Sequence, residues 1–128
     1  MVIDASALVA ILKMEPEREL FTRLIVRAAV RRISPVNWLE AAIQAERASP
    51  ESLAALDAYV SSAEIGVTSI DAFQMRIAHN AWRKFGKGKH PARLNLGDCF
   101  AYALAKQTGE ALLFKGRDFG LTDIKTAL

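Results

Sequence analysis

The sequence predicts an α/β fold in which a parallel sheet is covered by helices on both faces. Short apolar runs alternate with longer segments whose apolar residues recur at helical spacing. This alternation is typical of βαβ units, whose crossover helices pack on the faces of a parallel sheet. The 128 residues, 52% of them hydrophobic, are enough for one core. We therefore predict a single domain spanning residues 1–128.

The first elements are predicted by a β-branched pair and by helix-start signals. Val2-Ile3 predicts a strand that ends at Asp4, and a short helix is expected over residues 7–12. Glu15-Pro16-Glu17 opens a second helix, because proline suits the first turn and acidic side chains favour the positive end of the helix dipole. Apolar residues then recur at helical spacing along residues 20–28.

Two Ser-Pro pairs organise the middle of the chain. Residues 32–34 predict the second strand, and Ser34-Pro35 begins a helix to about Ala48, with serine as the cap and proline in the first turn. Ser49-Pro50 begins another helix in the same way, to about Ala63. Residues 66–68 predict the third strand.

The last third repeats the alternation around a glycine-containing loop. Asp71 is expected to cap a helix to about Phe85, and residues 86–93 form a loop. A helix over residues 95–108 leads to a strand at 111–114. The remaining expected features are a turn over residues 116–120 and a short final strand beginning near Ile124.

Four acidic residues lie where a strand is expected to end or a helix to begin: Asp4, Glu40, Asp98 and Asp118. In parallel α/β sheets the functional site lies beyond the carboxyl ends of the strands, so we expect these side chains to converge. Clustered carboxylates repel one another unless a cation neutralises them, and oxygen ligands suit a hard divalent cation. The pattern therefore predicts a metal site.

Each acid also has a purely structural interpretation. Asp4 could cap the following helix, and Asp98 could form a capping arrangement with Asn95. Glu40 could be an exposed residue in the first turns of its helix. Asp118 could be a turn residue, and the nearby Asp123 competes with it for a place in the site.

Positive charge gathers just before Asp98. The net charge is only +3, but residues 83–93 contain five Lys or Arg residues and no acid. A basic segment beside an acidic metal site is what a phosphate-backbone substrate would need. We therefore expect phosphate contacts from Lys87, Lys89 and Arg93 of this segment, and a further contact from Lys115 elsewhere in the chain.

Other polar and aromatic residues receive more ordinary roles. Ser6 could orient a carboxylate or a water at the metal, or simply cap a helix. Trp38 and Trp82 are expected in the core, and Cys99 is expected to be a small buried hydrophobe rather than a catalytic thiol. Charged residues interrupt every apolar stretch well before a membrane span of roughly 20 residues, and no leader is recognisable. We therefore expect a cytoplasmic protein.

Four blocks in this order resemble the PIN-domain ribonucleases, and among them the VapC toxins of type II toxin–antitoxin systems. The blocks are the opening residues 1–10, Glu40 in its helix, residues 94–106 and residues 112–119. The resemblance implies a single PIN domain, a three-layer α/β/α sandwich with a mostly parallel five-stranded sheet. It places the acidic pocket of the family, which binds Mg²⁺ or Mn²⁺, on the same four acids.

The resemblance also implies a reaction and partners. The expected activity is hydrolysis of phosphodiester bonds in RNA, with neutralisation by a VapB-like antitoxin and assembly as a homodimer. The helix over residues 20–28 is the expected wall of the antitoxin groove. Two alternatives remain open at this point: a non-catalytic RNA-binding PIN module, and a phosphatase with Asp4 as nucleophile. Phosphatases resembling the haloacid dehalogenases need a second Asp two positions later, where this chain has Ser6.

Overall fold

The computed structural model describes residues 1–128, and it contains six α-helices, four strands and one 3₁₀ turn. In chain order these are β1 (Val2–Ile3), α1 (Ala5–Leu12), α2 (Arg18–Arg27), β2 (Arg32–Ile33), α3 (Pro35–Ala48), α4 (Pro50–Ser62), β3 (Gly66–Val67), α5 (Ala72–Phe85), α6 (Leu96–Thr108), β4 (Leu112–Leu113) and η1 (Phe119–Leu121). The predicted alternation of strands and helices is confirmed.

The sheet has four strands in the order β3-β2-β1-β4, and every neighbouring pair is parallel. The expectation of five strands was wrong in this detail. The segment after Ile124 makes only a single bridge, between Leu112 and Thr126. Two backbone hydrogen bonds hold it, from Leu112 N to Lys125 O and from Ala127 N to Leu112 O, at 2.8 and 2.9 Å. This is too little pairing to form a fifth strand.

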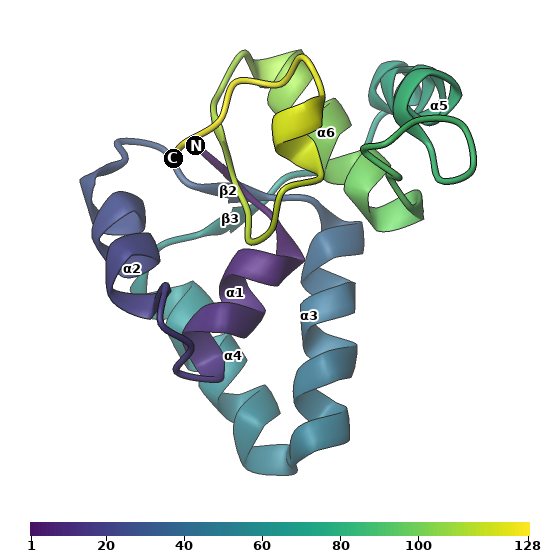
Figure 1. Cartoon of the computed structure of the whole chain (residues 1–128). Coiled ribbons are helices and arrows are strands. Elements are labelled where there is room, and N and C mark those ends of the chain that lie inside the picture. The colour runs from purple at the N-terminus through teal and green to yellow at the C-terminus, as the bar shows by residue number, and fades with distance from the viewer.

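Helices cover both faces of the sheet, as the three-layer prediction requires (Figure 1). Successive strand residues point to opposite faces. Val2 and Leu112 lie in a core cluster with α5 and α6, whereas Ile3 and Leu113 lie in a second cluster with α1 to α4. The two-residue strands therefore divide the core into two layers of apolar side chains.

Side-chain caps set the helix starts at the predicted places. The Oγ of Ser49 accepts a hydrogen bond from Ser52 N at 3.1 Å, and Asp71 accepts one from Gln74 N at 2.7 Å. Ser34 caps α3 in the same way, with Pro35 as its first residue. The first helix begins at Ala5, slightly earlier than expected, because Asp4 itself serves as the cap.

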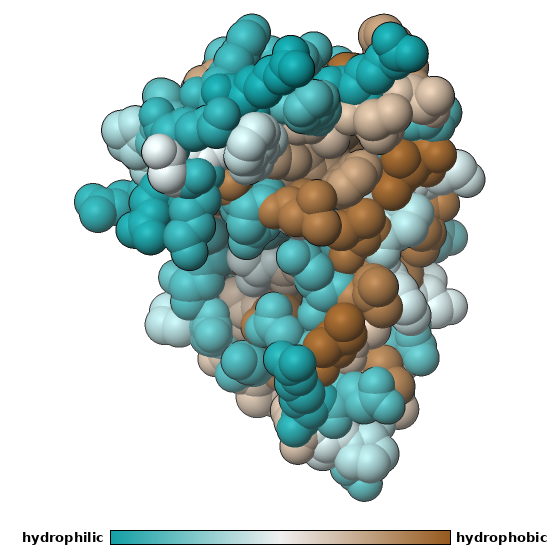
Figure 2. Space-filling view, turned by 90° about the vertical axis from the view of Figure 1, so that its right-hand side faces the viewer, coloured by the Kyte–Doolittle hydropathy of each residue, from teal (hydrophilic) through white to brown (hydrophobic).

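One face of the molecule exposes apolar side chains over α3, α5 and the start of α6 (Figure 2). Trp82 belongs to this face with 41% of its surface exposed, so its predicted place in the core was wrong. The ring lies instead against Gly86, where an added Cβ would come within 2.8 Å of the Trp82 ring. Trp38 is half-buried and packs against the core, as predicted. None of the helices combines the length and the hydropathy that a membrane span requires.

Candidate active site

Asp4 lies directly after β1, and only 4% of its surface is exposed. Its Oδ2 accepts hydrogen bonds from Ser6 N at 3.0 Å and from Ser6 Oγ at 2.5 Å. Ser6 Oγ in turn accepts a hydrogen bond from Lys115 N at 3.0 Å, which ties the ends of β1 and β4 together. Burial raises the pKa of Asp4, and the bonds from Ser6 oppose this rise. Asp4 is thus both a helix cap and a buried carboxyl group.

Asn37 is a polar residue of this region that we did not predict. It is fully buried on α3, and its Nδ2 donates to Asp4 Oδ1 at 3.2 Å, to Glu40 Oε2 at 3.2 Å and to the Gly97 carbonyl at 3.0 Å. Its Oδ1 has no hydrogen-bond partner in the protein. The available signal was its position one helical turn before Glu40, on a helix that begins at the end of β2.

Glu40 is half-buried and lies beside Asp4 and the first turn of α6. Burial raises its pKa, the charge of Asp4 raises it further, and the hydrogen bond from Asn37 opposes both effects. The carboxylate approaches Gly97 so closely that a Cβ on this residue would lie 2.0 Å from Glu40 Oε1. Glycine at position 97 therefore leaves the space that the Glu40 carboxylate occupies in the pocket.

Asp98 completes the capping box of α6 and also belongs to the acidic cluster. Its Oδ2 accepts from Asn95 N, and Asn95 Oδ1 accepts from Asp98 N, each at 2.9 Å. Burial raises the pKa of Asp98 to about 6, and the charges of the other three acids, Asp4, Glu40 and Asp118, add to the rise. The hydrogen bond from Asn95 N opposes it by lowering the pKa. The four predicted acids thus influence one another at one edge of the sheet.

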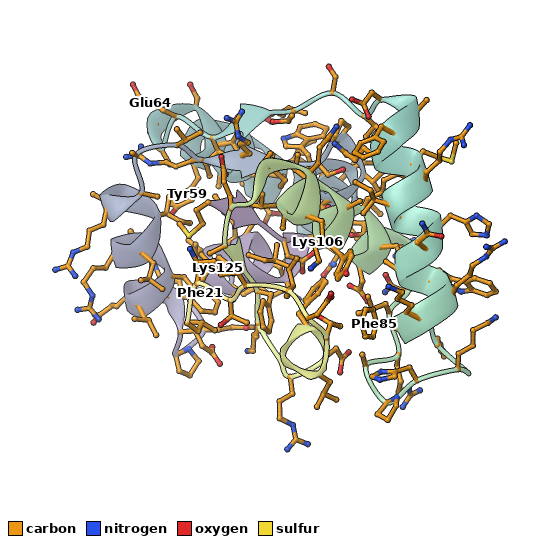
Figure 3. All side chains as sticks on the ribbon, turned by 90° about the horizontal axis from the view of Figure 1, so that it is seen from above. Phe21, Tyr59, Glu64, Phe85, Lys106 and Lys125 are labelled. Carbon is orange, nitrogen blue, oxygen red and sulfur yellow. The ribbon has the colours of Figure 1, made fainter.

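Asp118 and its competitor Asp123 have different surroundings. Asp118 is exposed immediately before η1 and makes no side-chain cap, and its charge acts on Asp98. Asp123 accepts a hydrogen bond from Tyr102 Oη at 2.6 Å and pairs at 3.0 Å with Lys106, which Figure 3 labels on α6. These bonds lower the pKa of Asp123, so this residue has a structural role.

In this structure no three Asp, Glu, His or Cys side chains lie close enough together to hold a metal ion. Each acid is instead held by its own neighbour: Asp4 by Ser6, Glu40 by Asn37 and Asp98 by Asn95. The groups nevertheless fit a hard divalent cation, because they offer only oxygen ligands, and burial and mutual repulsion oppose their negative charge.

The predicted phosphate contacts lie in two settings. Lys87, Lys89 and Arg93 are exposed on the loop between α5 and α6, and none takes part in a salt bridge. Backbone bonds from Lys87 N to Leu94 O and from Leu94 N to Phe85 O close this loop, so its charges are presented from a defined backbone. Lys115 is paired with Glu15 and, at 3.3 Å, with Glu17, so its charge is partly neutralised.

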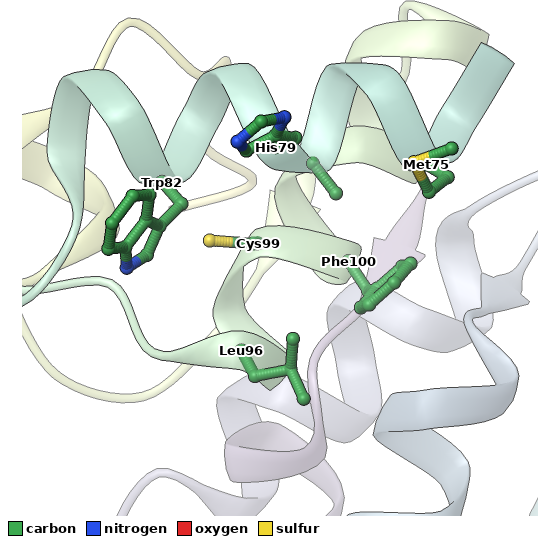
Figure 4. Close-up of a pocket in the computed structure, with 7 residues that line it drawn as sticks. Met75, His79, Trp82, Leu96, Cys99 and Phe100 are labelled. Atoms are coloured by element: carbon green, nitrogen blue, oxygen red, sulfur yellow. The ribbon is translucent and has the colours of Figure 1, made fainter. Parts of the chain in front are cut away.

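An apolar pocket of about 370 Å³ lies between α5 and α6, next to Asp98 (Figure 4). Cys99 lines it with only 3% of its surface exposed, and burial raises the pKa of its thiol to about 11, with a contribution from the charge of Asp98. The prediction that Cys99 is a small buried hydrophobe is confirmed. The other lining residues are Met75, Ala78, His79, Trp82, Leu96 and Phe100.

Comparison with known proteins identifies relatives along the whole chain. The model of the PIN domain family matches residues 1–125. Ribonuclease VapC of Mycolicibacterium smegmatis is 47% identical over 125 residues, which cover 97% of each chain. Ribonuclease VapC30 of Mycobacterium tuberculosis is 44% identical over 127 residues, which cover 98% of this chain and 97% of the relative.

Two solved structures share the fold at low sequence identity. Mycobacterium tuberculosis VapC20, described as a sarcin-ricin loop cleaving toxin, superposes with a TM-score of 0.76 at 16% identity over 96% of this chain and 95% of its own. A chain of a toxin–antitoxin complex from Klebsiella pneumoniae gives a TM-score of 0.74, also at 16% identity, over 99% of this chain and 97% of its own.

Proposed function

The chain belongs to the PIN-domain family and is a VapC-like ribonuclease toxin. We propose that its acidic pocket carries out the hydrolysis of phosphodiester bonds in RNA, and that it does so with a divalent cation. The strongest support for this site is the environment of Asp98. Burial raises the pKa of its carboxyl group to about 6, and the charges of Asp4, Glu40 and Asp118 add to the rise. A cluster of carboxyl groups that oppose one another's ionisation is stabilised by a bound cation.

Asp4 and Asp98 are the proposed main ligands of Mg²⁺ or Mn²⁺. Glu40 and Asp118 complete the site, directly or through water, because these cations keep several waters of hydration. Such a cation supplies charge stabilisation at the phosphoryl oxygens and lowers the pKa of water bound to it. Glu40 or Asp118 accepts the proton that the attacking water loses. Ser6 orients Asp4 through its two hydrogen bonds to Oδ2.

The loop between α5 and α6 is the proposed guide for the RNA backbone. Lys87, Lys89 and Arg93 are exposed and free of acidic partners, and they lie on the segment that leads into Asp98. Lys89 Nζ lies 4.1 Å from the centre of the Trp82 ring, so this aromatic side chain also stands at the edge of the basic surface. Lys115 joins them when RNA competes with Glu15 and Glu17 for its ammonium group.

The alternative with Asp4 as a phosphatase nucleophile receives no support from this geometry. Both carboxylate oxygens of Asp4 already accept hydrogen bonds, one from Ser6 and one from Asn37.

Cleavage of RNA by the purified chain tests the proposal. The wild-type protein is expected to cleave with Mg²⁺ or Mn²⁺ and to stop when EDTA is added, and Asp4→Asn is expected to be inactive. Asp123→Asn is a matched control, because Asp123 binds Tyr102 and Lys106 instead of the pocket. If Asp4→Asn cleaved as fast as wild type, the acids would not form the catalytic site, and tight RNA binding without cleavage would favour the non-catalytic module.

The proposed partner is an antitoxin that docks between α2 and α4. A groove there has three basic residues and one acidic residue in its lining, Arg18, Arg23, Arg27 and Glu19, together with Val26, a residue that is 64% exposed. The hydroxyl of Tyr59, on α4 at the groove, is buried without a partner (Figure 3). This lining favours a segment that combines apolar and acidic side chains. Arg23→Glu is expected to weaken binding of the cognate antitoxin without lowering cleavage, and unchanged antitoxin affinity would contradict the location.

We also propose a homodimer through the apolar face of α3, α5 and α6. Leu39 and Ile43 on α3, with Phe73 on α5 and Leu96 on α6, are 40–74% exposed, and apolar side chains gather on this face (Figure 2). Exposed apolar surface of this extent is typical of an interface. Leu39→Glu is expected to convert a dimer into a monomer in analytical ultracentrifugation, and an unchanged sedimentation coefficient would place the interface elsewhere.

A further inference from the structure

We propose that Asn37 is a positioning residue of the acidic pocket, in which the amide nitrogen holds Asp4 and Glu40 together in the arrangement that binds the cation. The inference rests on the proposed function, because it assumes that a cation occupies the pocket. It extends that function to a neutral residue that is neither an acid nor a predicted ligand.

The amide nitrogen is fully committed to acceptors. Nδ2 lies 3.2 Å from Asp4 Oδ1, 3.2 Å from Glu40 Oε2 and 3.0 Å from Gly97 O. All three neighbours accept and none donates, so the nitrogen and not the oxygen must face them. The side chain thereby joins the end of β1, the first turns of α3 and the start of α6, the three elements that carry Asp4, Glu40 and Asp98.

This orientation decides where the amide oxygen goes. With Nδ2 facing the acids and the Gly97 carbonyl, Oδ1 remains without a donor although the residue is fully buried. A buried acceptor without a partner is costly. The fold therefore tolerates an unsatisfied acceptor while it keeps the amide nitrogen on the two carboxylates of the pocket. Residues that hold metal-binding carboxylates in place commonly tune the affinity of the site.

An orphaned amide oxygen alone would not distinguish Asn37. Gln74 on α5 is also fully buried, and its Oε1 also lacks a partner. Its Nε2 donates to Gln107 at 2.7 Å and touches no member of the pocket. What sets Asn37 apart is the contact with two carboxylates, and Gln74 therefore provides a matched control for the loss of a buried amide.

Direct binding of Mn²⁺ to the EDTA-treated full chain tests the role without any measurement of cleavage. Asn37→Leu keeps the approximate shape and removes both polar atoms, and Gln74→Leu does the same outside the pocket. We expect Asn37→Leu to weaken Mn²⁺ binding, followed by electron paramagnetic resonance, by about 10- to 100-fold. It should also lose most of the Mn²⁺-dependent rise in the melting temperature. Gln74→Leu should keep both at the wild-type level.

Further variants separate the possible failures. If Asn37→Leu does not fold, Asn37→Ser replaces it, because the smaller hydroxyl can still donate to one carboxylate; it should bind Mn²⁺ more weakly than wild type. Unchanged Mn²⁺ affinity in the folded Asn37 variant, with affinity lost in Asp4→Asn, would overturn the role of Asn37 and leave the metal site intact. Unchanged affinity in Asp4→Asn would overturn the metal site itself, and the inference with it.

Discussion

Removing the charge of Asp98 is predicted to stabilise the protein when no cation is present. The pKa of this carboxyl group is raised from 3.8 to about 6, first by burial and then by Asp4, Glu40 and Asp118. A folded-state pKa above the unfolded value means that stability is fully present below pH 3.8 and is lost as the pH rises through about 6. The substitution is Asp98→Asn, whose amide oxygen can still accept the bond from Asn95 N.

The size of the effect follows from the pKa shift. A shift of this size corresponds to about 3 kcal/mol if the group were fully buried. Because Asp98 is only half-buried, solvent screening reduces this to about 1–2 kcal/mol. In EDTA at about pH 7.5, Asp98→Asn should therefore melt at a temperature roughly 3–10 °C higher than wild type. The difference should vanish at about pH 3, below the unfolded-state value of 3.8, where Asp98 is largely protonated in both states.

Two further thermal-denaturation experiments test whether the charge of Asp98 causes the effect. Asp123→Asn should show the opposite sign, because Tyr102 and Lys106 lower the pKa of Asp123, and its charge stabilises the fold at neutral pH. Saturating Mn²⁺ should reverse the order of wild type and Asp98→Asn, since only the intact pocket gains a ligand. The reasoning would be refuted if Asp98→Asn were no more stable than wild type in EDTA at neutral pH.

Three further predictions concern the neighbours of the acids. Gly97→Ala should displace Glu40, because Glu40 Oε1 would lie 2.0 Å from the new Cβ. The substitution should lower kcat for RNA cleavage and should reduce the free energy of unfolding, measured by chemical denaturation, by about 1–3 kcal/mol. An unchanged kcat would show that Glu40 is not needed in this position. Ser6→Ala should remove the Oγ hydrogen bond to Asp4, while the backbone bond from residue 6 remains. Stability above the pKa of the Asp4 carboxyl should fall by about 1–2 kcal/mol, and a loss that is equal at all pH values would contradict a bond to the charged form. Cys99 should resist alkylation by iodoacetamide at about pH 8 until the chain unfolds, because burial raises its thiol pKa to about 11; rapid labelling of the native protein would refute this.

Local signals predicted the helices and the acids, because both are properties of short segments. Ser34-Pro35 and Asp71 mark helix starts that need no tertiary context, and the structure places caps at both. Asp4 and Asp98 could be identified as candidate site residues because the carboxyl ends of parallel strands meet at one edge of the sheet, and this holds however the side chains pack. Their roles as helix caps were among the alternatives and are confirmed, whereas their part in a metal site stays a prediction.

The features that escaped prediction depend on partners from distant segments. Asn37 gains its place from Asp4 and Gly97, which lie 33 and 60 positions away, and nothing in its local sequence reveals them. Trp82 was assigned to the core from its apolar character, whereas contacts with Gly86 and Lys89 hold it at the surface. A short final strand was expected near Ile124, but the pairing that the chain forms there is a single bridge.

The most direct test of the central claim, that one pocket of acids uses a cation to cleave RNA, measures Mn²⁺ binding and RNA cleavage on the same EDTA-treated protein. We expect wild type to be inactive without cation, and cleavage to appear over the concentration range in which Mn²⁺ binds. Asp4→Asn should lose binding and cleavage together while keeping its circular dichroism spectrum. Cleavage that persists in EDTA, or that survives in Asp4→Asn, would show that the acids and a cation do not carry out the reaction.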